Sequence, residues 1–469
     1  MVDAHRVLAR AAAITAPTWG LFEHLFPESV QTDENRSVWI EGTPFYEPLP
    51  PLRGETNADL VIIGGGFTGT STAYHFSRRY PEKRVVLLEA RTIGNGASGR
   101  NGGHLLNGLA DPRSHATPEM TRRVHETTAR GIQNLIALIQ RHNLAVDHQL
   151  GGTLRVFTDA ERAEKAHQYS EEIAPLGIAE TFLTPAELQH KLNLQGVHGA
   201  ILDPLAGQIN GAQLTRSLRP ILLEAGVEIY ENTPVIRVEE GRNIQLHTPA
   251  ATVKTQAIVL ATNGYTTQLG YFRDAIFALH SHVFATAPQS AAELAALGWR
   301  EHDAYSDDLD RISYVARTSD GRIVFGGGSN ASYAYCFNNQ SVYPGSPERA
   351  KPAFAAMKRT FQQYLPGSVG LPITHRWTGT LGYTLARNTL MGVRGAHRNV
   401  FYALGYCGHG VNLANIAGEV LTDLYSGDDE RWRGLPFYDS QYLRIPPEPF
   451  RWLGYQLFTG LTGKAPRTQ

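Results

Sequence analysis

The feature that most constrains this chain is a glycine-rich turn that directly follows a short apolar run. Residues 59–63 read Asp-Leu-Val-Ile-Ile, and residues 64–69 read Gly-Gly-Gly-Phe-Thr-Gly. A helix-like stretch comes next, and residues 84–89 form a second apolar run that ends in Glu89. A strand, a G-x-G-x-x-G turn, a helix and a strand with a terminal acid are the parts of a dinucleotide-binding βαβ unit. The order and spacing of these parts predict a dinucleotide site.

Each of the three glycines in the G-x-G-x-x-G turn has a separate structural role. Gly64 permits the tight turn, Gly66 lets the backbone approach a pyrophosphate, and Gly69 lets the helix pack closely on the strand. The phosphates are then expected on backbone N–H groups at the helix N-terminus, where the helix dipole favours negative charge. Glu89 is expected to bind the ribose hydroxyl groups.

A second glycine-dense segment follows almost at once. Residues 93–104 read Ile-Gly-Asn-Gly-Ala-Ser-Gly-Arg-Asn-Gly-Gly-His. This density argues against a helix or a central strand, and it lets the backbone come close to a flat ligand. The alternative interpretation of the same residues is a mobile surface loop.

Residues 96–103, Gly-Ala-Ser-Gly-Arg-Asn-Gly-Gly, resemble the loop beside the isoalloxazine ring in the D-amino-acid-oxidase-like family of FAD-dependent amine oxidoreductases. The chain is most similar to the γ-glutamylputrescine oxidase branch, and the resemblance extends from residue 38 to residue 428. It implies that FAD, not NAD, is the cofactor. We expect the FAD to be held without a covalent bond. The alternative is a covalent flavin on His104, because histidine is chemically competent to form one.

Two further segments resemble the same family. Residues 399–414 predict a strand, a glycine-rich turn and an apolar helix, and in the family a matching turn places a helix N-terminus at the pyrimidine end of the flavin. Residues 258–264 resemble the strand and loop that complete the FAD domain. The resemblance implies an α/β fold (α+β overall), with a Rossmann-like FAD-binding domain of the glutathione-reductase type and a second, antiparallel-sheet substrate domain.

The expected elements follow this two-domain plan. Thr117 as N-cap and Pro118 at the first helical position predict a helix that continues to about His142. Residues 152–157 are predicted to form a strand, residues 159–173 a charged helix. The predicted division is an N-terminal extension (1–58), a discontinuous FAD-binding domain (59–110, 195–265 and 378–430), a substrate domain with a helical insertion (111–194 and 266–377) and a C-terminal extension (431–469).

The resemblance assigns the cofactor contacts to these motifs and to one position between them. The expected FAD-binding residues are Gly64, Gly66, Phe67, Thr68, Gly69, Glu89, Ala90, Arg91, Ala97, Ser98, Arg100, Asn101, Gly102, Gly103, His104, Leu105, Val235, Thr262, Asn263, Gly405, Gly408, His409, Gly410 and Val411.

The expected catalytic residues are few, because a flavin itself accepts the hydrogen and electrons of an oxidised C–N bond. Trp377 and Tyr383 match a segment that lines the substrate side of the flavin in relatives, and the domain core is the alternative interpretation of both. His104, Tyr314 and Asn412 complete this expected catalytic set. No general acid or base is implied.

Departures from the family bear on the substrate. Asn412 stands where the sarcosine-oxidase branch has a lysine that holds the substrate carboxylate, and Asn107 aligns with a second, carboxylate-binding arginine. A buried carboxylate needs a cation or several donors, so two neutral residues favour an amine whose carboxylate, if any, is remote. Arg317 and Arg376 are candidates to bind such a distant group.

A further departure lies in residues 384–392, where the family's T-x-D-x-x-P-x-x-G pattern has neither its acid nor its proline. Three functions are therefore considered. The first is oxidation of a γ-glutamylputrescine-like or other amine to an imine, with oxygen or a quinone as the final acceptor. The second is oxidation of an N-methyl or cyclic imino acid, and the third is a flavin-binding scaffold without turnover.

Composition limits the partners and the location. A net charge of −1 over 469 residues gives no basic surface for nucleic acid. Cys336 and Cys407 are the only cysteines, which excludes a disulfide framework and a cysteine metal cluster and favours a reducing compartment, the cytoplasm. No run approaches the ~18 apolar residues of a membrane span. The aromatic segments 19–26 and 450–458 are expected to pack on the body, with a peripheral membrane contact as the alternative.

Overall fold

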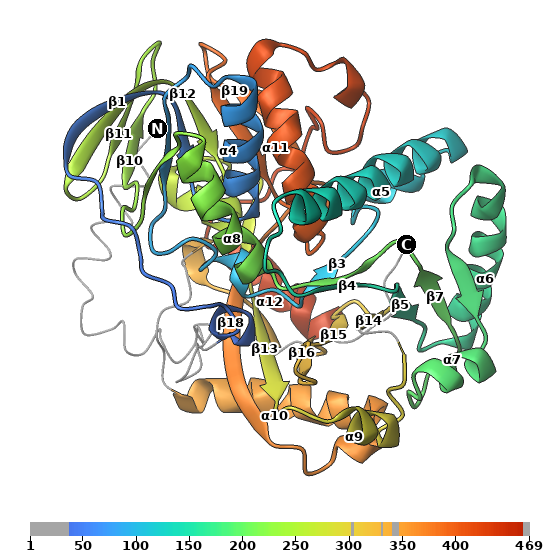
Figure 1. Ribbon diagram of the computed structural model, residues 1–469. Helices are drawn as coiled ribbons and strands as arrows, with labels where there is room; N and C mark the ends of the chain where they lie inside the picture. Colours follow the sequence, from blue (N-terminus) through green and yellow to red (C-terminus); the bar gives the residue numbers. More distant parts are fainter. Residues whose placement is uncertain (1–36, 302–303, 330–331, 340–346, 463–469) are drawn as a thin grey trace.

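The computed structural model describes residues 37–301, 304–329, 332–339 and 347–462 (Figure 1). The aromatic segment 19–26 lies outside the described residues. Within the described ranges, no helix combines the length and the apolar character needed to cross a membrane.

The first sheet is built around β1 (Gly54–Ile63), which pairs in parallel with β12 (Ala251–Leu260) and with β2 (Val85–Leu88). The sheet continues in parallel to β20 (Val400–Leu404) beside β12 and to β9 (Glu228–Tyr230) beside β2. Parallel strands covered on both faces are apolar along their length, as the buried end of β1 is. Three antiparallel strands extend the sheet: β10 (Arg237–Glu239), β11 (Ile244–His247) and β19 (Leu390–Arg394).

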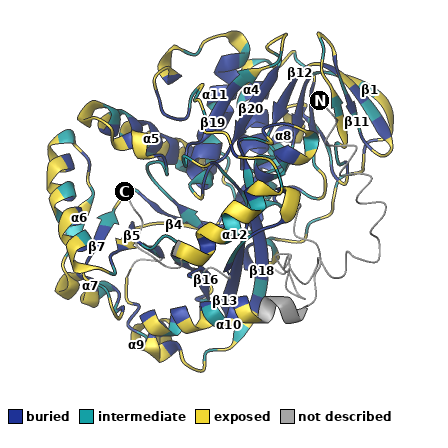
Figure 2. Ribbon diagram, turned by 180° about the vertical axis from the view of Figure 1, so that it is seen from behind, coloured by how far each residue is buried: buried dark blue, intermediate teal, exposed yellow. Residues whose placement is uncertain are grey.

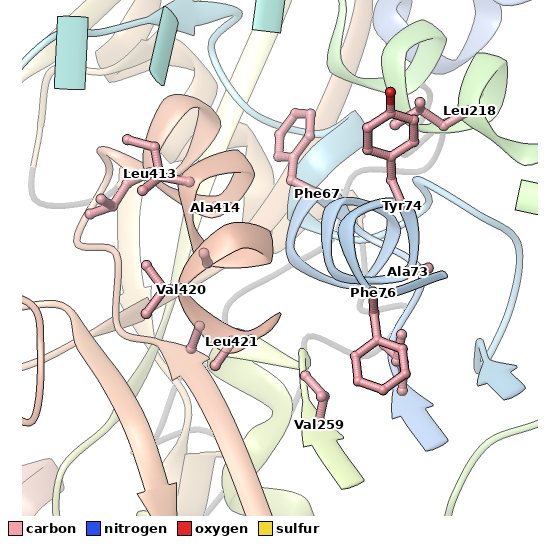
Figure 3. Packing of buried hydrophobic residues seen from close by; sticks show 14 of the residues in the cluster. Phe67, Ala73, Tyr74, Phe76, Leu218, Val259, Leu413, Ala414, Val420 and Leu421 are labelled. Carbon is pink, nitrogen blue, oxygen red and sulfur yellow. The ribbon is translucent and has the colours of Figure 1, made fainter. Parts of the chain in front are cut away.

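Helix α4 (Phe67–Arg79) lies at the centre of the first domain, between α8 (Gly211–Glu224) and α11 (Gly410–Ser426) (Figures 1 and 3). A Cβ at Gly418 would overlap Ser71, so the backbones of α11 and α4 approach as closely as glycine allows. This packing fixes the two helix N-termini that sequence analysis assigns to the cofactor.

The second sheet is largely antiparallel and forms the other domain, as expected. Phe284 and Phe325 stack inside it with ring centroids 5.4 Å apart, and Phe361 covers both from the helix beneath. Its strands are β17 (Tyr333–Tyr335), β13 (Phe277–Thr286), β18 (Ile373–Tyr383), β16 (Ile323–Gly327), β15 (Ser313–Arg317), β14 (Ala304–Asp307), β5 (Thr153–Val156), β7 (Ala200–Asp203) and β6 (Thr181–Leu183). The helices on this side are α6 (Ala160–Ile173), α7 (Pro185–Lys191), α9 (Ala291–Ala296) and α10 (Pro347–Tyr364).

The predicted long helix is confirmed as α5 (Pro118–Arg141), whose N-cap Thr117 accepts a hydrogen bond from the Met120 amide. The charged helix is confirmed as α6, which is capped by Asp159. A small sheet of β3 (His104–Leu105), β8 (Gly207–Ile209) and β4 (His148–Leu150) lies near α5 in Figure 1.

Strand pairing differs from the predicted domain boundaries at two places. The boundary at residue 195 would assign β7 to the FAD domain, but β7 pairs with β5 and β6 in the second sheet. The boundary at residue 378 divides β18, which pairs with β13 along its whole length. In both cases the hydrogen-bond ladder to a sheet neighbour, which is not visible in local sequence, determines where the strand belongs.

The C-terminal aromatic segment forms α12 (Phe450–Thr462), of which one side packs on the body. Arg451 is buried and donates to the carbonyl of Arg273, and the Tyr455 hydroxyl donates to the carbonyl of Tyr333. The other side is exposed (Figure 2), and it carries Phe450, Leu453, Leu457, Phe458 and Leu461. The expected packing therefore accounts for only part of this helix.

Candidate active site

The first glycine turn has the close contacts that its predicted role requires. Gly64 has a φ of +108°, and a Cβ there would lie 2.7 Å from the carbonyl oxygen of Ala261. A Cβ at Gly69 would overlap the Gly64 carbonyl oxygen. At Gly66, the N-cap of α4, it would lie 2.8 Å from Ser98 Oγ. Gly64 and Gly69 therefore exclude larger side chains, and a Cβ at Gly66 would displace the Ser98 side chain.

The N-terminus of α4 is tied to both other glycine-rich segments. The Phe67 amide donates to Ser98 Oγ at 2.9 Å. The hydroxyl groups of Thr68 and Tyr406 are hydrogen-bonded at 2.6 Å. Gly66 supplies no side-chain cap, so the first turn depends on these neighbours and on any anion that binds its remaining N–H groups.

Glu89 lies one residue beyond β2, beside the glycine turn. Its carboxylate accepts from the Gly65 amide at 2.7 Å and from the Arg91 amide at 2.9 Å. Burial raises the pKa of Glu89, while these amide hydrogen bonds lower it. Ala90 and Arg91 are exposed, and Val235 lies partly buried against the first sheet. The structure therefore places the Glu89 carboxylate beside the glycine turn, and its contact with the ribose remains a prediction.

In the second glycine-dense loop, every backbone carbonyl from residue 95 to residue 101 accepts a hydrogen bond from a protein group. The donors, in chain order of the carbonyls, are Arg100 Nε, the Gly99 amide, the Arg100 amide, Asn101 Nδ2, Ser37 Oγ, Trp377 Nε1 and Trp39 Nε1. In contrast, the amides of Gly96, Ala97, Asn101 and Gly102 have no acceptor among the described residues. A loop with bound carbonyls and open N–H groups is suited to an electron-rich ligand.

Two of these donors come from the N-terminal segment, which sequence analysis assigns only to an extension. Helix α3 (Val38–Glu41) begins after its N-cap Ser37. Trp39 is buried, its indole donates to the Asn101 carbonyl at 2.8 Å, and its ring would be 2.7 Å from a Cβ at Gly103. The serine before an apolar run is a helix-start signal that could have identified α3, but its contact with the loop is not visible in sequence.

His104 and Tyr314 meet beside this loop. His104 Nε2 lies 3.0 Å from the Val315 carbonyl oxygen, so this nitrogen carries the ring hydrogen. Burial lowers the pKa of His104 to about 4, which makes the imidazole neutral at physiological pH. Tyr314 is edge-on to His104, with 6.4 Å between the rings, and a Cβ at Gly102 would overlap its ring. Leu105, next to His104, is fully buried.

The Tyr314 hydroxyl is hydrogen-bonded to Ser281 Oγ at 2.8 Å, and burial raises its pKa to about 12. Trp377 is fully buried, and its indole donates to the Arg100 carbonyl at 3.1 Å. Tyr383 lies half-buried at the end of β18. Trp39 from α3 and Trp377 from β18 thus both support the loop.

The C-terminal glycine turn joins the third motif. The Gly405 amide donates to Asn263 Oδ1 at 3.0 Å, and the Cys407 amide donates to the Gly382 carbonyl at 3.2 Å. Cys407 itself has a φ of +51°, and burial raises the pKa of its thiol to about 11. The Thr262 and Thr266 hydroxyl groups are hydrogen-bonded at 2.8 Å.

Helix α11 begins immediately after this turn, as predicted. Gly408 has a φ of +93°, His409 is the N-cap, and Gly410 and Val411 form the first turn. The N-termini of α4 and α11 therefore lie on neighbouring helices. The predicted FAD-binding residues of the three glycine-rich segments are brought together, with Val235 apart from them near β10.

The two substrate-indicating asparagines are both engaged by the protein. Asn412 is buried, and its Nδ2 donates to the carbonyls of Thr128 and Leu106 at 2.8 and 3.3 Å. Asn107 Oδ1 accepts from Thr128 Oγ1 at 2.6 Å, and its Nδ2 lies 3.2 Å from a ring nitrogen of His125. Both side chains join the loop after β3 to helix α5, and neither brings a cation.

Comparison with known proteins identifies the family. The family model for DAO, FAD dependent oxidoreductase, matches residues 59–424. The chain is 26% identical to gamma-glutamylputrescine oxidoreductase of Escherichia coli over 431 residues, which are 88% of this chain and 96% of the relative. It is 26% identical to the probable oxidoreductase OrdL of Haemophilus influenzae over 412 residues, 84% and 89% of the two chains.

Among solved structures, glycine oxidase from Geobacillus kaustophilus is similar, with a TM-score of 0.65 and 20% identity over 79% of this chain and 95% of the other. The fold is thus that of this flavoenzyme class. The side-chain-free N-cap at Gly66 and the open amides of the loop fit an FAD molecule, as the family requires. The chain belongs to the DAO family of FAD-dependent oxidoreductases, and FAD is its cofactor.

Proposed function

We propose that this enzyme oxidises the C–N bond of an amine that has no carboxylate on the carbon next to nitrogen, with γ-glutamylputrescine-like amines as the main substrate class. The amine loses two electrons and two hydrogens and becomes an imine. Bound FAD supplies the acceptor for these electrons. The relative named gamma-glutamylputrescine oxidoreductase, aligned over 88% of this chain, supports the substrate class.

The observation that carries the proposal is the engagement of Asn412 and Asn107. An α-carboxylate held close to the reacting carbon would need a cation or several donors, because an unpaired buried carboxylate costs several kcal/mol. Asn412 Nδ2 already donates to the carbonyls of Thr128 and Leu106. Asn107 is held by Thr128 and His125. Both positions are therefore neutral, and their amide nitrogens already have protein partners.

The residues beside the loop also suit a neutral amine. A substrate amine must lose its proton before it can release electrons. His104 is neutral because burial lowers its pKa to about 4, and the Tyr314 hydroxyl keeps its proton because burial raises its pKa to about 12. These groups offer a polar, uncharged wall that orients the amine without competing for its proton. Their catalytic roles are part of this proposal.

The test is anaerobic reduction of the flavin, followed as loss of its absorbance after rapid mixing. The panel contains γ-glutamylputrescine, simple alkyl amines, sarcosine, N-methylalanine and proline. Faster reduction by the amines supports the proposal. Faster reduction by sarcosine, N-methylalanine or proline favours the N-methyl or cyclic imino acid function. Failure of every compound to reduce the flavin favours a flavin-binding protein without turnover.

The same experiment under air shows whether oxygen or a quinone accepts the electrons of the reduced flavin. Hydrogen peroxide formed in proportion to the amine consumed indicates oxygen. Reoxidation that requires an added quinone indicates a dehydrogenase. The cytoplasmic location expected from the two cysteines remains a prediction.

A further inference from the structure

Outside the glycine-dense loop of residues 93–104, which we call the flavin loop, a second group of polar side chains comes from the part of the fold where α5 faces α6 and strands β5 and β7 (Figure 1). One wall comes from α5 and the short turn of helix before it, and the other comes from the second sheet and α6. We call this group the mixed-charge cluster, and its members are His115, His125, Arg155, Tyr169, Glu180 and Asp203.

The sheet wall brings its charges to one face. In the ladder of β5 and β7, Arg155 is opposite Ile201 and Thr153 is opposite Asp203. Alternate residues of a strand share a face, so Arg155 and Asp203 lie on the same side of the sheet. Glu180 precedes β6, the next strand. Its carboxylate is close enough that the charges of Arg155 and Asp203 shift its pKa in opposite directions.

The three charged groups lie near one another without an ion pair between them, and the Arg155 side chain is exposed. Among the described residues, neither the Arg155 guanidinium nor the Glu180 carboxylate makes an ion pair or a hydrogen bond, although Arg155 lies over the Phe157 ring at 5.6 Å. Asp203 accepts only from backbone, with the Leu205 amide at 3.0 Å. Burial raises the pKa of both Glu180 and Asp203. Arg155 and Glu180 thus keep their hydrogen-bonding capacity for a ligand, and Asp203 has used only part of its own.

One hydrogen bond links the two walls, and another links the group to the loop that follows β3. His115 Nδ1 and the Tyr169 hydroxyl are hydrogen-bonded at 2.6 Å, which links the two walls. A ring nitrogen of His125 lies 3.2 Å from Asn107 Nδ2. Asn107 is only three residues after His104, which lies beside the flavin loop. Burial lowers the pKa of both histidines below the ordinary value, which favours their neutral forms beside Arg155 and the two carboxyl groups.

We propose that the mixed-charge cluster binds the zwitterionic α-amino-acid head group of the substrate. Arg155 would pair with the α-carboxylate, and the α-ammonium would lie between Glu180 and Asp203. The rest of the molecule would then extend past Asn107, so that its distal amine reaches the flavin loop.

This inference rests on the proposed function and deepens it, because γ-glutamyl amines have such a head group at the end remote from the oxidised amine. A purely anionic head would meet two carboxylates, and a purely cationic one would meet Arg155. Only a head group with both charges satisfies all three protein groups at once.

The test uses a ligand that cannot be oxidised at the distal end, γ-L-glutamyl-butylamide, which keeps the head group and lacks the terminal amine. Its binding to the holoenzyme is measured by titration calorimetry. Arg155→Met should weaken binding about 10-fold or more, as expected for loss of a charge-assisted pair. Arg122→Met is the control, because Arg122 is an exposed arginine of α5 that pairs with Glu126, and it should leave binding unchanged.

A second variant keeps the test decisive if Arg155→Met does not fold. In Glu180→Gln the side chain keeps nearly the same size but loses its charge, so the variant should bind γ-L-glutamyl-butylamide more weakly. The variant should bind the deaminated analogue, glutaric acid monobutylamide, at least as tightly as the unaltered enzyme does. Equal losses for both ligands, or none for either, would overturn the assignment.

Turnover separates this inference from the proposed function. With γ-glutamylputrescine, Arg155→Met should raise KM while kcat at saturation changes little, because the reacting end is untouched. If no amine reduces the flavin but the butylamide still binds and loses affinity in Arg155→Met, the proposed function fails and the cluster stands. If amines without the head group react as well as γ-glutamylputrescine and Arg155→Met changes nothing, amine oxidation stands and the cluster assignment fails.

Discussion

Gly66→Ala gives the sharpest test of the predicted pyrophosphate site. Gly66 has a φ of −85°, which alanine adopts without strain, so the substitution acts only through the added methyl group. That methyl would lie 2.8 Å from Ser98 Oγ, the acceptor of the hydrogen bond from the Phe67 amide. The Ser98 side chain must therefore rotate, and the Phe67 amide loses its partner.

The structural effect and the cofactor effect differ in size. Loss of one neutral hydrogen bond lowers the free energy of unfolding by about 1 kcal/mol. A methyl beside the pyrophosphate would in addition remove at least one charge-assisted hydrogen bond, worth ~1.5–3 kcal/mol, which weakens FAD binding roughly 10- to 150-fold. Gly66→Ala is thus expected to reduce FAD affinity far more than it reduces stability.

The assay is titration of the apoprotein with FAD, followed by quenching of flavin fluorescence, with a denaturant melt of each variant. Ser98→Ala provides the matched control, and the double variant removes the oxygen that the new methyl meets. We expect the double variant to equal Ser98→Ala in stability and Gly66→Ala in FAD affinity. A double variant that binds FAD as tightly as Ser98→Ala would refute the pyrophosphate role, because Gly66 would then serve only to leave room for Ser98.

Three further predictions concern other parts of the site. Trp39→Phe keeps a ring beside Gly103 but leaves the Asn101 carbonyl without its donor. The melting temperature of the holoenzyme should therefore fall by an amount equivalent to ~1–3 kcal/mol. An unchanged melting temperature would show that water replaces the indole. His282 is buried with its pKa lowered to about 4; since the unfolded chain takes up this proton near pH 6.5, stability should decrease as pH falls from 6.5 toward 4, by up to ~1.4 kcal/mol per pH unit. A His282→Gln variant should show a shallower decrease in denaturant melts, and an identical slope would contradict the lowered pKa. Acid precipitation should leave the flavin in the supernatant, because His104 Nε2 is held by the Val315 carbonyl; yellow precipitate would establish covalent attachment.

Local sequence was sufficient for the parts of the site that depend on backbone shape. The turn at Gly64 needs a positive φ, and the start of α5 needs the cap that Thr117 supplies, so both could be predicted residue by residue. Sheet membership could not, because β7 and β18 are assigned by hydrogen bonds to strands far along the chain.

The same limit applies to side chains that act across long sequence distances. Trp39 supports a loop carbonyl 62 residues away, and no pattern around Trp39 indicates that contact. Arg155 lies on β5 and Glu180 directly precedes β6, and they come near each other only when β5, β7 and β6 pair. Asn412 departs from the family pattern in the sequence, but only the structure shows that its Nδ2 donates to the carbonyls of Thr128 and Leu106.

The bound carbonyls of residues 95–101 have a consequence for how the cofactor enters. Their donors are all protein groups, from α3, from β18 and from the loop itself. The shape of the loop is therefore set in advance, and an arriving flavin does not have to order it. Association that demands little loss of conformational entropy retains more of its contact energy as affinity. Flavin analogues with altered rings should therefore bind the apoprotein without any rearrangement of the loop. Their association rates should be set by diffusion and by how well each ring fits the site.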